Sequence, residues 1–525
     1  MRFSFLLRLF LALGWSVTCL HTFAESSVSA EVLFQQYCAA CHGTDRLGSM
    51  GPALLPESLT RIKPAEAIRV VQEGRAATQM PPFAPILTTT QIQSLVSMLY
   101  QPTLVSPAWD APQIRHSRVV HYAPDTLGTK PVFQADPMNI FLVVEGGDHH
   151  ISVVDGDQFS VIHRFPTRYA LHGGPKFTAD GRYVFLASRD GWISKFDLWN
   201  LKVVSEIRAG LNTRNVAVSP DGNMVAVANY LPHTLVILDG NLELQKVIPV
   251  QGEGLDGKPV SSRVSAVYDA GPRKSFVAAL KDAQELWEIS YDPQAPDIPI
   301  SAIHDFQYGE GSFIPGFLNP RRTRLHDYLD DFFFTQNYNE VIGASRQAGR
   351  GQVINLDSRK KIADLTLPGM PHLGSGITWQ WQGKTVMATP NLNQALISIV
   401  DMQNWELIKE VPTRGPGFFL RSHENSPYAW TDSMMSRTHK DTMQVLDKQG
   451  LKIVAELSPE PGKVFTHAEF TKDGSHVLTS LSEMKGAIIV YDAKTLREIK
   501  RLPMSKPIGK YNVWNKINRS EGTSH

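Results

Sequence analysis

Two cysteines and a histidine stand close together near the N-terminus, in the order Cys38-Ala39-Ala40-Cys41-His42. At this spacing both thiols can add to the vinyl groups of one haem while His42 binds its iron. A redox disulfide and half of a zinc site are the competing interpretations. Zinc would need a second Cys/His pair, and the chain contains no cysteine after Cys41. The motif therefore predicts one covalently bound haem c.

A methionine downstream of this motif supplies the sixth iron ligand in our interpretation. Gln79-Met80-Pro81-Pro82 holds a thioether in a stretch that proline makes rigid, and Met50 is the rival candidate. Apolar residues at helical spacing in 30–37 and 90–100 predict two helices that flank the motif, as in a class I cytochrome c. Ligation by histidine and methionine leaves no open position on the iron, so it favours electron transfer at this haem.

Histidines and arginines recur further along the chain, where they open or follow short apolar runs. They are His172, Arg189, Arg214, Arg263, His326, His372, His423 and His467. Imidazoles ligate iron, and guanidinium groups bind carboxylates through two parallel hydrogen bonds. A single buried histidine is more often structural, but several on one rim suit a second, non-covalent tetrapyrrole with several carboxylates. Zinc is an alternative for the histidines, although it does not explain the arginines.

The elements that must position these residues form a repeat. Short β-branched runs end on aspartate eight times, at Asp155, Asp197, Asp239, Asp292, Asp357, Asp401, Asp447 and Asp492. Neighbouring marks lie 42 to 65 residues apart, which is the length of a four-stranded propeller blade with two insertions. Turns with Asp-Gly at 178–181, 219–222 and 471–474 resemble tight hairpins. The pattern predicts an all-β eight-bladed β-propeller, with a β-sandwich as the alternative.

In such a ring the strand before each hairpin is the inner one. The residues that open the inner strands therefore gather at one mouth of the central channel, and most of the histidines and arginines fall in this register. His423 and Arg189 instead follow a strand. We also expect 114–122 to supply a strand to the final blade.

The first residues are typical of a secretory signal. Met1-Arg2-Phe3 begins an apolar stretch that reaches Leu20, and Thr22-Phe23-Ala24 follows it as the predicted cleavage region. We predict a signal peptide at 1–24, export to the periplasm and no membrane span in the mature chain. A membrane anchor and a lipid anchor on Cys19 are the alternatives.

The length of 525 residues indicates more than one domain. A proline-rich stretch near residue 105 separates helical from β-rich sequence, so we predict an all-α cytochrome c domain at 25–104 and the propeller at 105–525. The formal net charge of +1 argues against a broad surface for nucleic acid or an anionic membrane.

Short motifs along nearly the whole mature chain resemble the cytochrome cd1 nitrite reductase family and its relatives in haem d1 biosynthesis. They are the Cys38–His42 motif, the Met80 loop, Tyr169–His172, Gly181–Tyr183, Ser188–Asp190, Asp197–Trp199, Leu325–Asp327, Pro371-His372 and Gly509–Val513. The resemblance implies that His172 is the proximal ligand of haem d1. It also implies that Arg189, Arg214 and Arg263 hold the carboxylates of that tetrapyrrole.

The family resemblance covers reductases that convert nitrite to nitric oxide and a cytochrome that oxidises dihydro-haem d1 in the last biosynthetic step. In the reductases, the resemblance implies distal loops of Leu-His-Asp-Gly-Gly and Pro-His-Pro-Gly-Arg-Gly. Here the loops are Leu325-His326-Asp327-Tyr328-Leu329 and Pro371-His372-Leu373-Gly374-Ser375-Gly376, and little chain precedes Cys38. These departures favour the dehydrogenase. Nitrite reduction, or a carrier that binds haem d1 without converting it, are the alternatives.

The dehydrogenase reaction turns a propionate of the tetrapyrrole into an acrylate, with loss of two hydrogens from adjacent carbons. Histidine is the natural base for such a step near neutral pH. We predict His326 in this role, with His423 assisting and His372 as a third catalytic candidate. The electrons leave one at a time through haem c to a periplasmic acceptor. A nitrite reductase is the candidate recipient of the finished haem d1.

Overall fold

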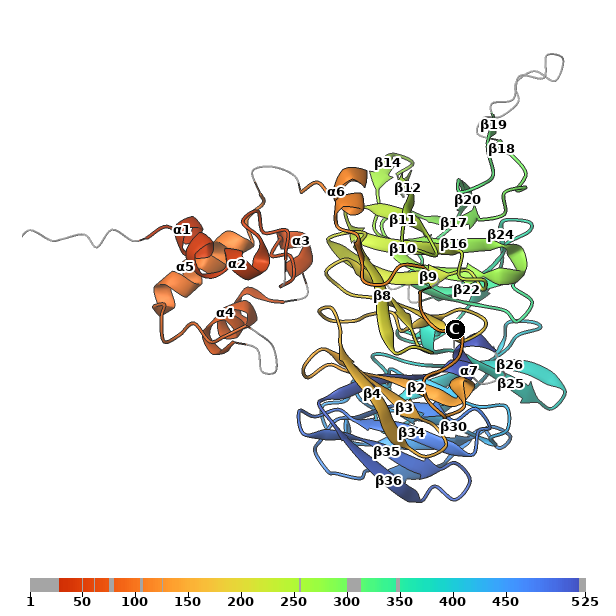
Figure 1. Ribbon diagram of the computed structural model, residues 1–525. Coiled ribbons are helices and arrows are strands. Elements are labelled where there is room, and N and C mark those ends of the chain that lie inside the picture. The colour runs from red at the N-terminus through yellow and green to blue at the C-terminus, as the bar shows by residue number, and fades with distance from the viewer. Residues whose placement is uncertain are drawn as a thin grey trace, which may run out of the picture.

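A small helical domain lies beside a larger ring of sheets in the computed structural model (Figure 1). The structure describes residues 28–49, 51–60, 62–74, 80–103, 107–124, 126–254, 256–299, 313–345 and 350–518. The predicted fold class, a small helical domain followed by an eight-bladed β-propeller, is confirmed. The predicted signal peptide and the predicted domain boundary near residue 105 lie outside the described residues.

Five helices form the small domain. They are α1 (Ala30–Tyr37), α2 (Ala39–His42), α3 (Pro56–Leu59), α4 (Pro64–Glu73) and α5 (Thr89–Leu99). Helices α1 and α5 are the pair that the apolar spacing predicts, and they contact each other. Ser29 and Thr88 begin them because each side-chain oxygen accepts a backbone N–H of the first turn. Leu33 and Leu95 are buried in the core that the helices share.

In the described part of the chain, eight antiparallel sheets follow, each built on four strands from the axis outward. The four strands are in chain order except in blade 1, whose inner strand is the C-terminal β37, and blade 2 gains a fifth, outer strand. Blade 1 contains β37 (Pro507–Asn512), β2 (Ile140–Glu145), β3 (His150–Asp155) and β4 (Ser160–Pro166). Blade 2 contains β5 (Lys176–Phe177), β6 (Tyr183–Ala187), β7 (Trp192–Asp197) and β8 (Lys202–Arg208). Blade 3 contains β9 (Asn212–Val218), β10 (Met224–Leu231), β11 (Thr234–Asp239) and β12 (Leu244–Pro249). Blade 4 contains β15 (Val264–Ala270), β16 (Ser275–Leu280), β17 (Glu285–Ser290) and β20 (Pro320–Arg324).

The other four blades have the same order. Blade 5 contains β21 (Asp331–Phe334), β22 (Glu340–Ser345), β23 (Arg350–Asn355) and β24 (Lys360–Leu365). Blade 6 contains β25 (Ile377–Trp381), β26 (Lys384–Pro390), β27 (Leu396–Asp401) and β28 (Leu407–Pro412). Blade 7 contains β29 (Leu420–Ser422), β30 (Tyr428–Asp432), β31 (Met443–Asp447) and β32 (Lys452–Leu457). Blade 8 contains β33 (Phe465–Phe470), β34 (His476–Leu481), β35 (Gly486–Asp492) and β36 (Glu498–Met504).

Two small hairpins account for the longer steps in the repeat. The first consists of β13 (Gln251–Glu253) and β14 (Pro259–Ser261), between blades 3 and 4. The second consists of β18 (Ile298–Pro299) and β19 (Phe313–Ile314), inside blade 4. The first strands of neighbouring blades contact each other, as β9 does with β15 and β33 with β37. These strands therefore surround the axis of the ring.

The aspartates that mark the repeat close the turn between the third and fourth strands. The Asp155 carboxylate accepts the backbone N–H groups of Asp157 and Gln158 at 2.8 and 3.1 Å, which is the geometry of an Asx turn. In blade 5 Asn355 makes this turn, with the N–H of Ser358 at 2.8 Å. Asp357 therefore marks blade 5 correctly, although Asn355, two residues earlier, is the residue that forms the turn.

The three Asp-Gly turns join first to second strands in blades 2, 3 and 8, as predicted. Gly181, Gly222 and Gly474 have φ angles of 71°, 72° and 75°, a region that glycine enters without steric cost. The turns therefore mark the mouth of the channel opposite to the one at which the first strands begin.

The C-terminal strand closes the ring, so the expectation that 114–122 supplies a strand to the final blade is wrong. Strand β37 pairs with β2, with Tyr511 opposite Leu142. Residues 111–116 instead form α6 (Ala111–His116), and β1 (Val119–Val120) adds an outer fifth strand to blade 2 by pairing with β8. The physical reason is continuity, because every blade passes from its outer strand to the inner strand of the next, and β36 to β37 repeats this step. Helix α7 (Val513–Ile517) follows.

The small domain packs on the ring at blades 2 and 3. Ala53 and Leu55 are buried against Leu211, with Trp109 and Leu231 at the edge of this small apolar cluster. Figure 1 shows the domain beside α6 and β8. None of the helices in the described ranges combines the length and the apolar character that a bilayer crossing requires.

Candidate functional site

Helix α2 gathers the residues of the Cys-x-x-Cys-His motif in the small domain. Cys38 is its N-cap, and Cys41 and His42 lie within its single turn. His42 Nδ1 lies 2.8 Å from the carbonyl oxygen of Pro52, so Nδ1–H donates there and Nε2 is left as the metal-binding atom. A Cβ atom on Gly51 would lie 2.7 Å from Cε1 of His42. The imidazole therefore rests on bare backbone, in an orientation that suits axial ligation of a haem iron.

The Cys38 thiol does not have the electrostatics of a reactive cysteine. Burial, and then the proximity of Cys41, raises the pKa of the Cys38 thiol to about 11. A redox-active cysteine needs a lowered pKa, because the thiolate is the nucleophile. The redox disulfide interpretation is therefore disfavoured, and the arrangement fits covalent attachment of haem c through Cys38 and Cys41.

The loop that carries Met80 is fixed against the end of α4. Gly74 ends this helix with φ of 72°, and a Cβ atom there would lie 2.7 Å from the Met80 carbonyl oxygen. The N–H of Phe83 donates to the carbonyl of Val71 at 3.0 Å. These contacts hold Met80 half-buried at a defined place in the small domain. The rival ligand Met50 lies outside the described residues.

At the mouth of the propeller where the first strands begin, a strained loop carries His172. Ala170, Gly173 and Gly174 have positive φ angles of 47°, 85° and 71°. The N–H of His172 donates to Ala187 at 2.9 Å, so the loop is tied to β6. His172 Nδ1 lies 2.6 Å from the carbonyl oxygen of Arg214. This bond leaves Nε2 as the atom that can bind an iron.

Arg214 lies half-buried directly beside His172. One Nη atom of Arg214 lies 3.1 and 3.3 Å from the two ring nitrogens of His172, and Nε donates to the carbonyl of Ser265 at 2.9 Å. Burial acts to lower the pKa of Arg214, but the Asp331 carboxylate, 3.8 Å away, together with Tyr268, Tyr230 and Asp330, outweighs burial and raises that pKa. Tyr268 donates to the same carboxylate at 2.8 Å. A fixed positive charge thus stands next to the predicted proximal ligand.

Arg189 and Arg263, the other two arginines predicted to bind carboxylates, lie at this mouth and differ in their contacts. Arg189 follows β6, and its main chain bonds Ala170 and Thr213 at 3.1 and 3.3 Å. Arg263 precedes β15 and makes a two-pronged ion pair with Asp282, with contacts of 2.8 and 2.5 Å. The guanidinium of Arg263 is therefore already neutralised by a carboxylate of this chain.

The two histidines of the distal loops differ in burial. His372 Nδ1 lies 2.7 Å from the carbonyl oxygen of Phe418, and its ring packs 4.1 Å from the ring of that residue. Burial lowers the pKa of His372, while Asp331 acts in the opposite direction. His326 is exposed between β20 and β21, and its carbonyl accepts the side-chain amide of Gln284 at 2.7 Å. The structure thus brings His372 to the channel and leaves His326 on the surface of the mouth.

His423 does not join this group. It follows β29 and lies against the Asp-Gly turn of blade 8, where a Cβ atom on Gly474 would come 2.4 Å from its Nδ1. Lys448 donates to its carbonyl at 3.0 Å, and the residue is fully buried. The prediction that His423 assists His326 is therefore corrected. His423 follows the end of the first strand of blade 7, and that end lies at the mouth opposite to the one where the first strands begin.

The inner strands of blades 8 and 1 add a pair of residues to the mouth whose role sequence reasoning missed. A Cβ atom on Gly174 would lie 3.0 Å from the ring of Tyr511, so this ring touches the His172 loop. The His467 ring lies 5.4 Å from the Tyr511 ring, and its buried Nε2 has no hydrogen-bond partner among the residues that the structure describes. Burial, and then the charge of Lys510, holds the pKa of His467 well below its usual range. Burial raises the pKa of Tyr511 to about 12.

Two signals in the sequence pointed to this pair without specifying its role. His467 opens the first strand of blade 8, and Tyr511 stands in the Gly509–Val513 motif. Their contact depends on ring closure, because β37 brings the C-terminus beside blade 8. The wrong assignment of the closing strand concealed it.

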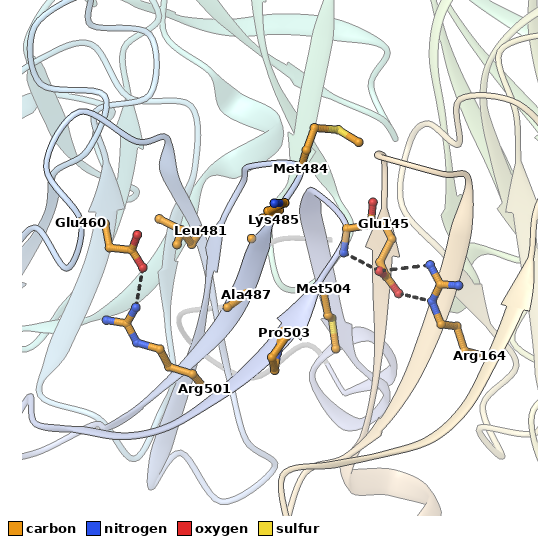
Figure 2. Close-up of a pocket in the computed structure, with 12 residues that line it drawn as sticks. Glu145, Arg164, Glu460, Leu481, Met484, Lys485, Ala487, Arg501, Pro503 and Met504 are labelled. Carbon is orange, nitrogen blue, oxygen red and sulfur yellow. Dashed lines mark hydrogen bonds and ion pairs between the residues drawn. The ribbon is translucent and has the colours of Figure 1, made fainter. Parts of the chain in front are cut away.

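A cavity of about 630 Å³ opens elsewhere, between blades 8 and 1, and Figure 2 shows its lining. Arg164 of the outer strand β4 pairs with Glu145 on one side. Arg501 of the outer strand β36 pairs with Glu460 on the other. Because outer strands line this cavity, it lies at the rim of the ring and contains none of the predicted site residues.

Comparisons with known proteins agree with both parts of this arrangement. The model of the cytochrome D1 heme domain family matches residues 135–516, and that of cytochrome c oxidase, cbb3-type, subunit III matches residues 28–98. The chain is 52% identical over 516 residues to the dihydro-heme d1 dehydrogenase of Pseudomonas aeruginosa, covering 98% of this chain and 99% of that protein. It is 24% identical over 550 residues to the nitrite reductase of Stutzerimonas stutzeri, covering 95% and 94%.

A solved structure is similar along most of the chain. Dihydro-heme d1 dehydrogenase NirN in complex with DHE superposes with a TM-score of 0.85 at 53% sequence identity, covering 93% of this chain and 100% of that one. The small helical domain and the propeller thus recur together in one relative.

Proposed function

The chain belongs to the cytochrome D1 heme domain family, and from this premise we propose that it is a c-type cytochrome that oxidises dihydro-haem d1 to haem d1. The observation that carries the proposal is 52% identity over 98% of the chain to a dihydro-heme d1 dehydrogenase, against 24% to a nitrite reductase. The relative crystallised with DHE supports a tetrapyrrole substrate for this chain.

The distal loops of this chain give the proposal local support. Leu329 is fully buried, and a Cβ atom on Gly343 would lie 1.9 Å from its side chain. Leu373 and Ser375 are each 1% exposed. These residues stand where the sequence departs from the reductase pattern, and their side chains fill space below the mouth. The distal loops of this chain are therefore anchored by buried side chains at the positions where the reductase pattern has glycine, proline and arginine.

The reaction breaks one C–H bond on each of two adjacent propionate carbons and forms a C=C bond. Two protons and two electrons leave the substrate. Cys38, Cys41, His42 and Met80 would hold haem c, and that group would supply one-electron redox chemistry between the substrate and an external acceptor.

The roles of the residues at the mouth follow from their burial and contacts. We assign axial ligation of the tetrapyrrole iron to His172 through Nε2, with Arg214 and Arg189 as the positive charges for its carboxylates. Arg263 is the least suited to this task, since Asp282 occupies it. His372 is the candidate group on the opposite, distal side, and it replaces the exposed His326 there.

Proton removal is assigned to Tyr511 and His467. Tyr511 is half-buried and touches the His172 loop, whereas His467 is fully buried behind it. Burial and the charge of Lys510 lower the pKa of His467, so this ring is neutral and does not retain a proton. Its Nε2 has no hydrogen-bond partner among the described residues, so we assign to it the transient relay of a proton rather than its storage. Tyr511 is the member of the pair that touches the His172 loop, and its ring lies 5.4 Å from the His467 ring, so a substrate at the mouth meets Tyr511 first.

We further propose that the mature protein works in the periplasm after cleavage of residues 1–24, with domains at 25–104 and 105–525. The predicted signal and the covalent haem site support this location. The external partners in this proposal are a periplasmic electron acceptor and a nitrite reductase that receives haem d1.

The deciding experiment mixes the purified haem c protein with dihydro-haem d1 and an electron acceptor. We expect reduction of haem c in the visible spectrum, and loss of two hydrogens from the extracted pigment by mass spectrometry. Unchanged pigment combined with nitrite turnover would make the protein a nitrite reductase. Unchanged pigment that is bound, without nitrite turnover, would make it a carrier.

A further inference from the structure

Arg208, the last residue of β8, contacts both domains with one side chain. Its Nε donates to the carbonyl oxygen of Asp190 at 2.8 Å. Its two Nη atoms donate to the carbonyl oxygens of Leu47 at 2.6 Å and Gly48 at 3.3 Å. Leu47 and Gly48 belong to the small domain, whereas Asp190 belongs to a loop of blade 2. The guanidinium therefore forms a hydrogen-bonded bridge across the domain interface.

The main chain of Arg208 holds the segment that joins the two domains. Its carbonyl oxygen accepts the indole N–H of Trp109 at 2.8 Å, and its N–H donates to the Ser117 hydroxyl at 2.9 Å. The guanidinium also lies over the Trp109 ring, 4.7 Å from its centroid. Arg208 thus makes hydrogen bonds to the small domain, to the connecting segment and to a loop of blade 2.

On the side of the small domain, the bridge leads to the predicted haem c ligand. The N–H of Gly48 donates to the carbonyl of His42 at 2.8 Å. The same loop continues to Pro52, whose carbonyl holds the His42 imidazole. A shift of Leu47 and Gly48 relative to the propeller would therefore move His42.

On the propeller side, the bridge leads to the predicted tetrapyrrole ligand. Asp190 follows Arg189, whose N–H donates to Ala170 at 3.1 Å. Ala170 lies two residues before His172 in the strained loop at the mouth. Arg208 is thus one hydrogen bond away from the loop that holds His42 and two hydrogen bonds away from the loop that carries His172.

The interface needs such a directional contact. Its apolar cluster contains few buried side chains, Ala53, Leu55 and Leu211, and apolar contact has no preferred orientation. Domains joined by a small interface move relative to each other by default. Arginine suits the task because its planar, always protonated fork can donate to several carbonyls at once, which a lysine ammonium cannot do in fixed geometry.

We propose that Arg208 is a positioning residue that fixes haem c at a set distance and orientation from the tetrapyrrole mouth, and so determines the rate of electron transfer between them. The inference rests on the proposed function. In each transfer one electron leaves the substrate and reduces the haem c iron from the ferric to the ferrous state. An external acceptor then reoxidises that iron, and the substrate's two protons leave through the propeller residues.

The test uses the full-length haem c protein and compares Arg208→Lys and Arg208→Met with wild type. Arg182→Lys is the matched control, because Arg182 is a part-buried arginine of the same blade that donates to the carbonyl of Gly128 at 3.0 Å and pairs with Asp197. It lies at the turn of blade 2, at the opposite mouth. Stopped-flow absorbance measures haem c reduction by dihydro-haem d1, and titration measures binding of the tetrapyrrole. Small-angle scattering measures the radius of gyration.

We expect Arg208→Met to slow haem c reduction by about 100-fold, since a displacement of about 1 Å has effects of this size on positioned reactions. Arg208→Lys should be intermediate. Tetrapyrrole affinity and reduction of haem c by ascorbate should stay unchanged, while the radius of gyration increases. Arg182→Lys should lower stability and leave the rate of haem c reduction as in wild type.

Wild-type rate and radius in a folded Arg208→Met protein would overturn the inference. So would an equal loss of rate in Arg182→Lys, because a general loss of stability would then explain both variants. If wild-type haem c is not reduced by dihydro-haem d1 at all, the proposed function fails instead. The scattering comparison then still decides whether Arg208 fixes the two domains.

Discussion

The haem c site and the propeller mouth are assembled from opposite kinds of contact. In the small domain, one helical turn and the loop behind it are sufficient, since His42 bonds Pro52 only 10 residues further on. At the mouth, His172 bonds Arg214 across 42 residues, and His372 bonds Phe418 across 46. The first site is therefore defined by local sequence, whereas the second exists only when the blades are in place.

This difference predicts that the two sites fail independently. The largest expected effect is that of His172→Ala, which removes the proposed iron ligand and should weaken tetrapyrrole binding by about 100-fold or more. The haem c spectrum should stay as in wild type, because no residue of the small domain changes. Titration with dihydro-haem d1, followed by absorbance, measures the affinity. Wild-type affinity in this variant would contradict the assignment of His172.

The second prediction separates proton removal from binding within the mouth. Tyr511→Phe removes only a hydroxyl and should lower kcat by about 100-fold, within the range of acid–base catalysis, with little change in affinity. Tyr491→Phe is the control, because Tyr491 is also a buried tyrosine of the propeller and packs on Trp430 away from the mouth. Single-turnover assays with mass analysis of the pigment measure kcat. Equal activities of the two variants would remove Tyr511 from this role.

Variants of His372 and His326 test whether burial or the sequence motif identifies the histidine that acts in the reaction. His372→Ala should lower kcat/KM by about tenfold or more, because this ring is fixed in the channel. His326→Ala should change it by less than about threefold, as expected for an exposed side chain. Steady-state rates with an excess of electron acceptor measure both. A larger effect of His326→Ala would restore the role that the sequence motif suggested.

Stability should fall in mild acid more through the propeller than through the small domain. Burial lowers the pKa of His372, His423 and His467 in the folded protein. Below about pH 6.5 the unfolded chain therefore binds more protons than the folded protein does. The sign follows from linkage: stability is complete above the unfolded pKa near 6.5 and is lost as pH falls below it. His467 alone should contribute about 1–2 kcal/mol of this loss at pH 5. Thermal melting of wild type and His467→Gln from pH 7.5 to pH 5 measures it, and equal pH dependence would contradict the prediction.

The smallest expected effect on activity is that of His423→Gln, at the opposite mouth. The variant should lose about 1 kcal/mol of stability, because the buried Nδ1 that accepts the N–H of Asn425 at 3.1 Å is replaced. Its kcat/KM should stay within about twofold of wild type. Thermal melting and the turnover assay measure the two quantities. A large loss of activity in a stable variant would show that the two mouths are coupled.

Local signals were sufficient for much of the fold. The aspartate marks identified all eight blades because an Asx turn needs its residue at a fixed place after each third strand, as Asp155 shows. Helix α1 and helix α5 followed from apolar spacing alone, and the structure adds their caps, Ser29 and Thr88. The closing strand did not, because β-branched sequence is suitable for an edge position as well as an inner one, and only the path of the chain around the ring distinguishes them.

What the sequence alone determined was the haem c motif and the set of histidines and arginines available to the propeller. Covalent spacing in Cys38–His42 is a property of one helical turn, so no tertiary structure is needed to recognise it. Tertiary structure decided which of the other residues meet. It brought Tyr511 from the C-terminus to the His172 loop, bound Arg263 to Asp282 and sent His423 to the opposite mouth. The physical reason is that side-chain contacts between blades depend on ring closure and on strand direction, and neither is written in any single segment.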